Sequence, residues 1–178
     1  MAKAPPDGYT LLVIGQAHWI GPLMQEVPYD AVRDYASITI ADRSPSVVVV
    51  HPSLPVKSVA ELIALAKSKP GQLNFGSIQA GSAAHLAGEL FKYVAGVNLV
   101  WVPYKTMGAA VTDLVSNQIQ VTFSTPSSVM PQVGAGRLRA LAVATLQPSL
   151  LTPGLPTAAS TGLPGYKAAS IRNESPRC

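Results

Sequence analysis

The sequence has few of the features that mark enzymes, metal sites or disulfide-stabilised domains. Its 178 residues include one cysteine, Cys178 at the last position, so no internal disulfide can form. The three histidines, His18, His51 and His85, lack metal-ligand spacing to cysteines or carboxylates. The nine acidic residues include no close pair suited to acid–base chemistry. These absences favour a binding protein over an enzyme, with no cofactor expected.

Charge is also scarce. Only 12% of the residues are charged, and the net charge of +4 comes from scattered residues rather than from a basic run. Basic residues are not interleaved with aromatic ones, so nucleic acid is not expected as a partner. A mildly basic chain favours a small anionic ligand over a cationic one. With 48% hydrophobic residues the chain can form a sizeable core, and its low charge indicates either a neutral polar surface or a surface that packs against something else.

Long apolar segments are missing too. No stretch reaches the roughly 20 apolar residues of a membrane span. Residues 1–7 contain no apolar core of the kind that signal peptides have, so the chain as written is expected to carry no signal peptide.

What the sequence does contain is an alternation of strand and helix patterns. Strands are predicted at residues 47–51, 97–102, 119–123 and 138–144. Between the first two, Ser58 and Glu61 form a capping box that predicts the start of a helix. This alternation, repeated four times over residues 47–144, predicts an α/β fold with a mostly parallel, doubly wound sheet.

A further strand is predicted near the start of the chain. Residues 9–14 form a near-continuous apolar run, which is typical of a strand buried on both faces of a parallel sheet. The run ends at residues 15–18, a candidate ligand loop. After residue 147 the proline, glycine and serine content rises and the periodicity disappears.

The stretch 73–91 reads as a short strand, a turn rich in glycine and serine, and a helix. Ser82 is placed to cap that helix, and Gly96 lies just past its expected end. A helix N-terminus offers free N–H groups and a partial positive charge, which suit a carboxylate or a phosphate. The alternative is a tight turn that binds nothing. The glycine spacing is that of a phosphate-binding loop, but Ser82 replaces its lysine, so a nucleoside triphosphate is not expected.

Two further loops would join this one. In a doubly wound sheet the loops that leave the carboxyl ends of the strands gather at one edge. Here these loops are 76–82, 104–108 and 124–128, all small and polar. Their convergence favours an anion site. Two side chains keep alternative roles: Lys105 is a charge partner or a solvated lysine, and His85 reaches the ligand edge or packs.

Six strings carry a family resemblance. They are PDGYTLL at 6–12, VPYD at 27–30, KSVAEL at 57–62, HLAGELFK at 85–92, VPYK at 102–105 and GRLRALAV at 136–143. Their order and spacing resemble the Bug family, the solute receptors of tripartite tricarboxylate transporters, over about residues 4–170. The resemblance implies a periplasmic location, a small organic di- or tricarboxylate as ligand, and a membrane permease as partner.

The resemblance also implies a type II periplasmic-binding-protein fold. A partial first domain is expected at 1–44, a second α/β domain at 45–146, and a return segment with a divergent tail at 147–178. The ligand-binding residues it implies are Gly15, Gln16, Ala17, His18, Ser77, Gln79, Gly81, Ser82, Ala83, Tyr104, Lys105 and Ser124. Thr106 stands where the family has glycine, and Ser124 stands where it often has aspartate, so ligand identity is affected more than ligand binding.

Both ends of the sequence depart from the family pattern. Family members begin with a signal peptide and a first strand whose loop completes the site, and this chain starts after that region. Beyond Ser170 the sequence is unrelated to the family, which predicts a frameshift and a truncated receptor. The alternative is a remnant that binds nothing, or one that self-associates through exposed sheet edges.

Overall fold

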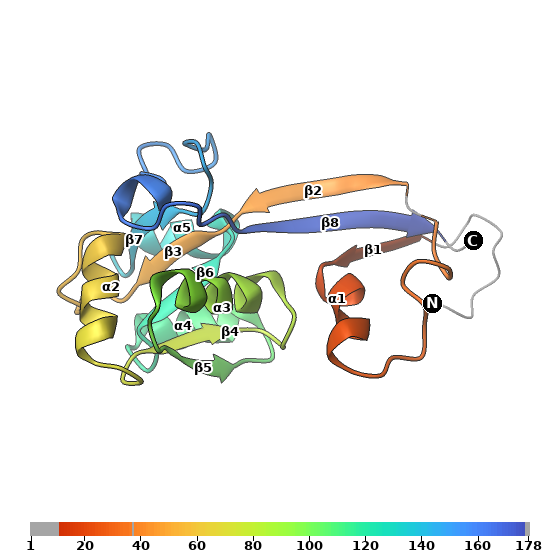
Figure 1. Cartoon of the computed structure of the whole chain (residues 1–178). Helices are drawn as coiled ribbons and strands as arrows, with labels where there is room; N and C mark the ends of the chain where they lie inside the picture. Colours follow the sequence, from red (N-terminus) through yellow and green to blue (C-terminus); the bar gives the residue numbers. More distant parts are fainter. Residues whose placement is uncertain (1–10, 37, 177–178) are drawn as a thin grey trace.

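The structure of the protein is a computed structural model that describes residues 11–36 and 38–176. Figure 1 shows two lobes of unequal size joined by the long strands β2 and β8. The residues considered for a signal peptide, and the first two residues of the strand predicted at 9–14, lie outside the described part. Among the described helices, none combines the length and apolar character needed to cross a membrane.

The smaller lobe contains a three-stranded sheet in the order β1-β8-β2. Its strands are β1 (Leu11–Gly15), β2 (Thr39–Pro45) and β8 (Ala169–Pro176), and β8 runs antiparallel to both neighbours. The segment after Ser170 therefore supplies most of the central strand of this sheet. Helix α1 (Ala17–Met24) packs beside β1.

The prediction of a parallel strand buried on both faces at residues 9–14 is wrong. β1 is an edge strand in an antiparallel sheet, and Leu11 and Val13 are 53% and 56% exposed. An apolar run indicates a strand, but it does not say which strands lie beside it or which faces are covered.

The larger lobe contains a five-stranded sheet in the order β5-β4-β6-β3-β7. Its strands are β3 (Val47–Val50), β4 (Asn74–Ser77), β5 (Val100–Pro103), β6 (Val121–Ser124) and β7 (Arg139–Val143). β4 pairs parallel with β5 and β6, whereas β3 is antiparallel to β6 and β7. Four of these strands thus point the same way and β3 runs against them, which confirms the predicted α/β fold with a mostly parallel sheet.

Four helices cover the two faces of this sheet: α2 (Val59–Ser68), α3 (Ala83–Ala95), α4 (Met107–Val115) and α5 (Pro126–Gly134). The chain then passes through a short 3-10 helix, η1 (Ala159–Thr161), before β8. Two predicted helix ends are confirmed. Ser58 accepts a hydrogen bond from the Glu61 amide at 3.2 Å, and Gly96 ends α3 in the left-handed conformation with φ 61°.

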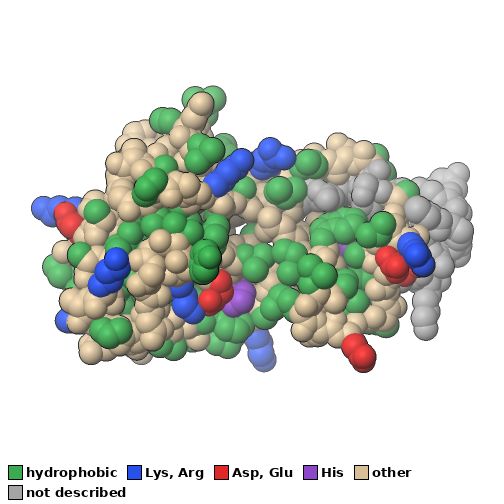
Figure 2. Space-filling view, viewed as in Figure 1, with side chains coloured by type: hydrophobic (Ala, Val, Ile, Leu, Met, Phe, Trp, Pro, Cys, Tyr) green, Lys and Arg blue, Asp and Glu red, His purple; other side chains and the backbone are tan. Residues whose placement is uncertain are grey.

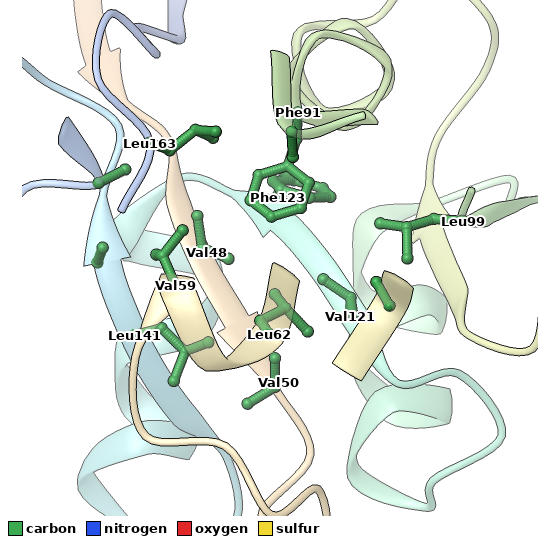
Figure 3. Packing of buried hydrophobic residues seen from close by; sticks show 14 of the residues in the cluster. Val48, Val50, Val59, Leu62, Phe91, Leu99, Val121, Phe123, Leu141 and Leu163 are labelled. Atoms are coloured by element: carbon green, nitrogen blue, oxygen red, sulfur yellow. The ribbon is translucent and has the colours of Figure 1, made fainter. Parts of the chain in front are cut away.

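The core follows the alternation of β3. Val48 and Val50 pack with residues of α2 and α3, including Leu62 and Phe91 (Figure 3). Val47 and Val49 point to the other face and pack with residues of α4 and α5. All four valines are fully buried, so β3 holds the two helical layers on one sheet.

The two lobes are joined by adjacent segments. β2 leads directly into β3 through Ser46, whose amide donates to the Ala168 carbonyl at 3.0 Å. The Ser46 carbonyl accepts from the Ala144 amide at 2.7 Å, which ties this crossing to the end of β7. These bonds place the connection between the lobes at the edge of the larger sheet from which α3 and α5 begin.

Candidate ligand-binding site

A cleft of about 690 Å³ lies between the lobes. The smaller lobe contributes Gly15, Gln16, Ala17 and His18 to its lining, and the larger lobe contributes Gln79, Ser82, Ala83 and Ser124. The sequence predicts these eight residues as site residues, and the structure brings them together although they lie in three separate segments of the chain. Figure 2 shows mostly hydrophobic and neutral side chains where the lobes meet, with an acidic side chain and a histidine at the border of the larger lobe.

Helix α3 begins at the cleft with free backbone donors. The Ser82 hydroxyl accepts from the His85 amide at 3.3 Å, and its carbonyl accepts from the Leu86 amide at 2.9 Å. Ala83 and Ala84 are the first two residues of α3, so their amides have no acceptor within the helix. Both residues line the cleft, so this helix end can bind an anion through N–H groups and the helix dipole.

Helices α1 and α5 also begin at the cleft. The Gln16 carbonyl accepts the first helical hydrogen bonds of α1 at 3.0 Å, which leaves the Ala17 and His18 amides as unpaired helix-end donors. Thr125 precedes α5, and its hydroxyl lies 3.2 Å from the hydroxyl of Ser128. Both Thr125 and Ser128 line the cleft. Three helix N-termini from two lobes therefore face one space.

His18 sits in an aromatic cluster at the wall of the cleft. Its ring stacks on Tyr29 with 4.4 Å between centroids, and it meets Tyr35 edge-on at 4.7 Å. The residue is 6% exposed, and its Nε2 has no hydrogen-bond partner among the described residues. Burial lowers the pKa of His18, which favours the neutral ring.

The lining provides neutral donors rather than cations. Its hydroxyl-bearing residues include Ser46, Ser82, Ser124, Thr125, Ser128 and Ser170. Glu26 is exposed at the cleft, and neither lysine nor arginine occurs among the described residues that line it. No group of residues suited to holding a metal ion occurs in the described part of the chain. An anion in this cleft would be held by N–H and O–H groups.

Two of the residues predicted in the β4–α3 stretch lie outside the cleft lining. The Ser77 side chain is fully buried and accepts a hydrogen bond from the Trp101 indole at 2.8 Å. The Gly81 amide donates to His85 Nδ1 at 3.3 Å. These two hydrogen bonds fix the loop on the side away from the cleft, and Gln79 and Ser82 of the same loop line the cleft.

The sequence leaves two roles open for His85, contact with the ligand or packing, and in the structure its side chain packs. Its ring lies 4.2 Å from that of Trp101, centroid to centroid, and burial lowers its pKa. His85 is buried, and the cleft lining does not include it.

The predicted pair Tyr104 and Lys105 also lies outside the lining. The Tyr104 hydroxyl donates to Asp113 Oδ2 at 2.7 Å, and burial together with this carboxylate raises the pKa of Tyr104 to about 12. Lys105 is exposed to solvent. Tyr104 thus joins the loop to helix α4, and Lys105 takes the solvated role of its two alternatives.

Several lining residues were not predicted as site residues. Tyr29 and its neighbours Val27 and Pro28 line the cleft from the loop after α1, and Met107 lines it from the start of α4. The string at 27–30 is part of the family resemblance, but the sequence analysis predicts no ligand contact for it. Its aromatic residue, which follows a proline on a polar loop, was the available signal.

Comparison with known proteins identifies the family. The model of the TctC family, described as the tripartite tricarboxylate transporter family receptor, matches residues 1–172. Protein BugT of Bordetella pertussis is 34% identical over 171 residues, which cover 94% of this chain and 52% of BugT. The chain spans about half the length of the curated relatives it matches.

Solved structures give the same assignment. An R. palustris protein solved with adipate is 33% identical, with a TM-score of 0.90, over 99% of this chain and 60% of that protein. The periplasmic binding protein BugD is 25% identical with a TM-score of 0.89 and similar coverage. The resemblance seen in the sequence is confirmed: the chain belongs to the tripartite tricarboxylate transporter receptor family, whose members are periplasmic substrate-binding receptors rather than enzymes.

Proposed function

We propose that this chain binds a small organic anion of the di- or tricarboxylate type in the cleft between its lobes. In this proposal it acts in the periplasm and passes the ligand to the membrane permease of a tripartite tricarboxylate transporter. The observation that carries the proposal is the meeting of three helix N-termini at one cleft. The related R. palustris protein with adipate supports the choice of ligand class.

The donors suit carboxylates for a physical reason. A hydrogen bond from an amide to a charged group contributes about 1.5–3 kcal/mol, and the helix dipole adds roughly 0.3–1 kcal/mol at each terminus. The Ala83 and Ala84 amides lie in one lobe and the Ala17 and His18 amides in the other. A ligand with carboxylates at both ends can engage both lobes and favour their closure.

The first experiment compares ligands of equal length and different charge. Thermal unfolding of the full chain is followed with adipate, 1,6-hexanediol and 1,6-diaminohexane, with citrate as a tricarboxylate. A ligand that binds only the folded state raises the melting temperature as its concentration increases. At 100 times the dissociation constant, the free energy of unfolding rises by about 2.7 kcal/mol. We expect adipate or citrate to stabilise the chain and the diol and diamine to have no effect. Equal responses to adipate and hexanediol would contradict an anion site.

The second experiment uses a matched pair of helix caps. Ser82 and Ser58 cap α3 and α2 in the same way, each accepting from the amide three residues on, but only Ser82 lines the cleft. Aspartate is as good a helix cap as serine, so both substitutions should fold. We expect Ser82→Asp to abolish carboxylate binding by placing a negative charge at the donors, and Ser58→Asp to retain it. Binding that survives in both variants would remove α3 from the site.

The alternative is a chain that binds no ligand and self-associates. The exposed apolar side chains of Leu11 and Val13 on the edge strand β1 favour it. Size-exclusion chromatography separates the two: a monomer with carboxylate-dependent melting supports the receptor, and a dimer or larger species without a ligand response supports the alternative.

A further inference from the structure

The side chain of Met24 in the smaller lobe lies close to the ligand-site loop of the larger lobe. Met24 is the last residue of α1, and Gly81 lies in the loop between β4 and α3, which faces α1 in Figure 1. A β-carbon at Gly81 would lie 3.2 Å from the Met24 sulfur, closer than an ordinary van der Waals contact. The Met24 sulfur therefore lies next to the Gly81 backbone, with too little space between them for a side chain at position 81.

The surroundings of this contact tie it to the cleft. Gly81 has φ 78°, a left-handed conformation that favours glycine, and its amide is bonded to His85. Its neighbour Ser82 caps α3 and lines the cleft. Met24 is itself outside the lining and 51% exposed. The contact thus lies at the rim, one residue from the helix end that supplies the proposed anion donors.

We propose that the contact between Met24 and Gly81 holds the two lobes together and that oxidation of the Met24 sulfur breaks this contact. The proposal rests on the proposed function, since a looser cleft holds its ligand less tightly. The oxidant is hydrogen peroxide. The sulfur lone pair attacks one peroxide oxygen, the O–O bond breaks, and the products are methionine sulfoxide and water. Sulfur is oxidised by two electrons and the peroxide is reduced by two.

The structure gives a reason for the change in packing. The added oxygen makes the side chain polar and larger at the point where the sulfur already meets the Gly81 backbone. Met24 is also the most accessible target among the described methionines, because Met107 and Met130 are both partly buried. Exposure governs methionine oxidation, so Met24 should react first. The change is reversible by methionine sulfoxide reductases.

The test begins with variants and no oxidant. Met24→Gln imitates the polar sulfoxide, Met24→Leu keeps an apolar side chain of similar volume, and Met130→Gln is the matched control away from the rim. The radius of gyration of each ligand-free protein is measured by small-angle X-ray scattering, and adipate affinity by calorimetry. We expect Met24→Gln to enlarge the particle and to weaken adipate binding by about tenfold, the effect of losing a half-buried apolar contact. Met24→Leu and Met130→Gln should match the wild type.

Peroxide then tests the oxidation itself. Peptide mass spectrometry should find the first added oxygen on Met24, with adipate affinity falling in parallel and recovering after treatment with the reductase. The affinity of Met24→Leu should not respond to the same peroxide dose. Unchanged scattering in Met24→Gln, or oxidation of Met24 without loss of compactness, would overturn the proposal. If the wild type binds no carboxylate but Met24→Gln still has a larger radius of gyration, the proposed function is wrong and the proposed contact between the lobes is supported.

Discussion

Helix α3 carries the proposed anion donors, and a single glycine sets how closely it lies on the sheet. A β-carbon at Gly88 would lie 2.3, 2.7 and 2.8 Å from three ring atoms of Phe75, the fully buried aromatic residue of β4. Alanine normally stabilises a helix interior over glycine by about 1 kcal/mol. Here the added methyl has no space, because the Phe75 ring is packed against Phe123 and cannot move outward.

The expected result of Gly88→Ala is thus a loss of stability. Overpacking of this kind costs about 1–3 kcal/mol, and contacts this short point to the upper end or beyond, so the net loss should be about 2 kcal/mol. For a chain of this size that corresponds to a melting temperature lower by roughly 4–8 °C. Because the helix must shift to relieve the clash, carboxylate binding at its N-terminus should weaken as well.

Gly134→Ala is the matched control. Gly134 is the last residue of α5, and a β-carbon there would meet no atom within 4 Å. This substitution should leave stability unchanged or raise it by up to about 1 kcal/mol. Urea unfolding monitored by circular dichroism measures both variants. A Gly88→Ala protein as stable as the Gly134→Ala protein would show that α3 does not depend on this close approach.

Three further predictions concern buried polar groups. Tyr166→Phe removes the hydrogen bond that the tyrosine hydroxyl donates to a carbonyl of α3 at 2.9 Å and should cost about 1 kcal/mol in urea unfolding. The pKa of Tyr104 is raised from 10.0 to about 12, so its contribution to stability is present below pH 10 and is lost as the pH rises toward 12. Tyr104→Phe, which also leaves Asp113 without this donor, should therefore show a smaller fall in stability across that range, and an identical fall would contradict the shift. Burial lowers the pKa of His18 and of His85 below 6.5, so the stability that they contribute is present above pH 6.5 and is lost as the pH falls through their folded-state values. Unfolding free energies at pH 7.5 and at pH 5.5 should differ less in His18→Phe than in the wild type.

Much of the larger lobe could be predicted from local sequence patterns. The alternation of strands and helices, the cap at Ser58 and the glycine stop at Gly96 depend on neighbouring residues, and the structure shows each of them. The strand predicted at residues 9–14 exists as β1, but its predicted parallel pairing and burial are wrong, because a local apolar run does not indicate which strands lie beside it. Its antiparallel pairing comes from β8, more than 150 residues later in the chain.

The site divides in the same way. Of the eight predicted residues that line the cleft, Gln79, Ser82, Ala83 and Ser124 lie at the ends of parallel strands, whose loops reach one sheet edge. The other four, residues 15–18, follow the antiparallel strand β1 and are brought to the cleft by the smaller lobe. Ser77 and Tyr104 have equally suitable polar groups, but Ser77 is hydrogen-bonded to Trp101 and Tyr104 to Asp113. Which polar group is free depends on side chains brought close by the fold, and spacing along the chain does not reveal it.

By itself the sequence determined the family, the α/β order of the larger lobe and the loops able to offer helix N-termini, because each follows from short-range patterns or from strings in a fixed order. Only the tertiary structure decided that α1 faces α3 and α5 across one cleft, that His18 is enclosed by aromatic rings, and that Met24 reaches Gly81. The cleft and the approach of Met24 to Gly81 join residues distant in sequence, and they exist only because the strands β2 and β8 connect the two lobes. The rings around His18 come from the same lobe, and their packing depends on how the segment after α1 folds back.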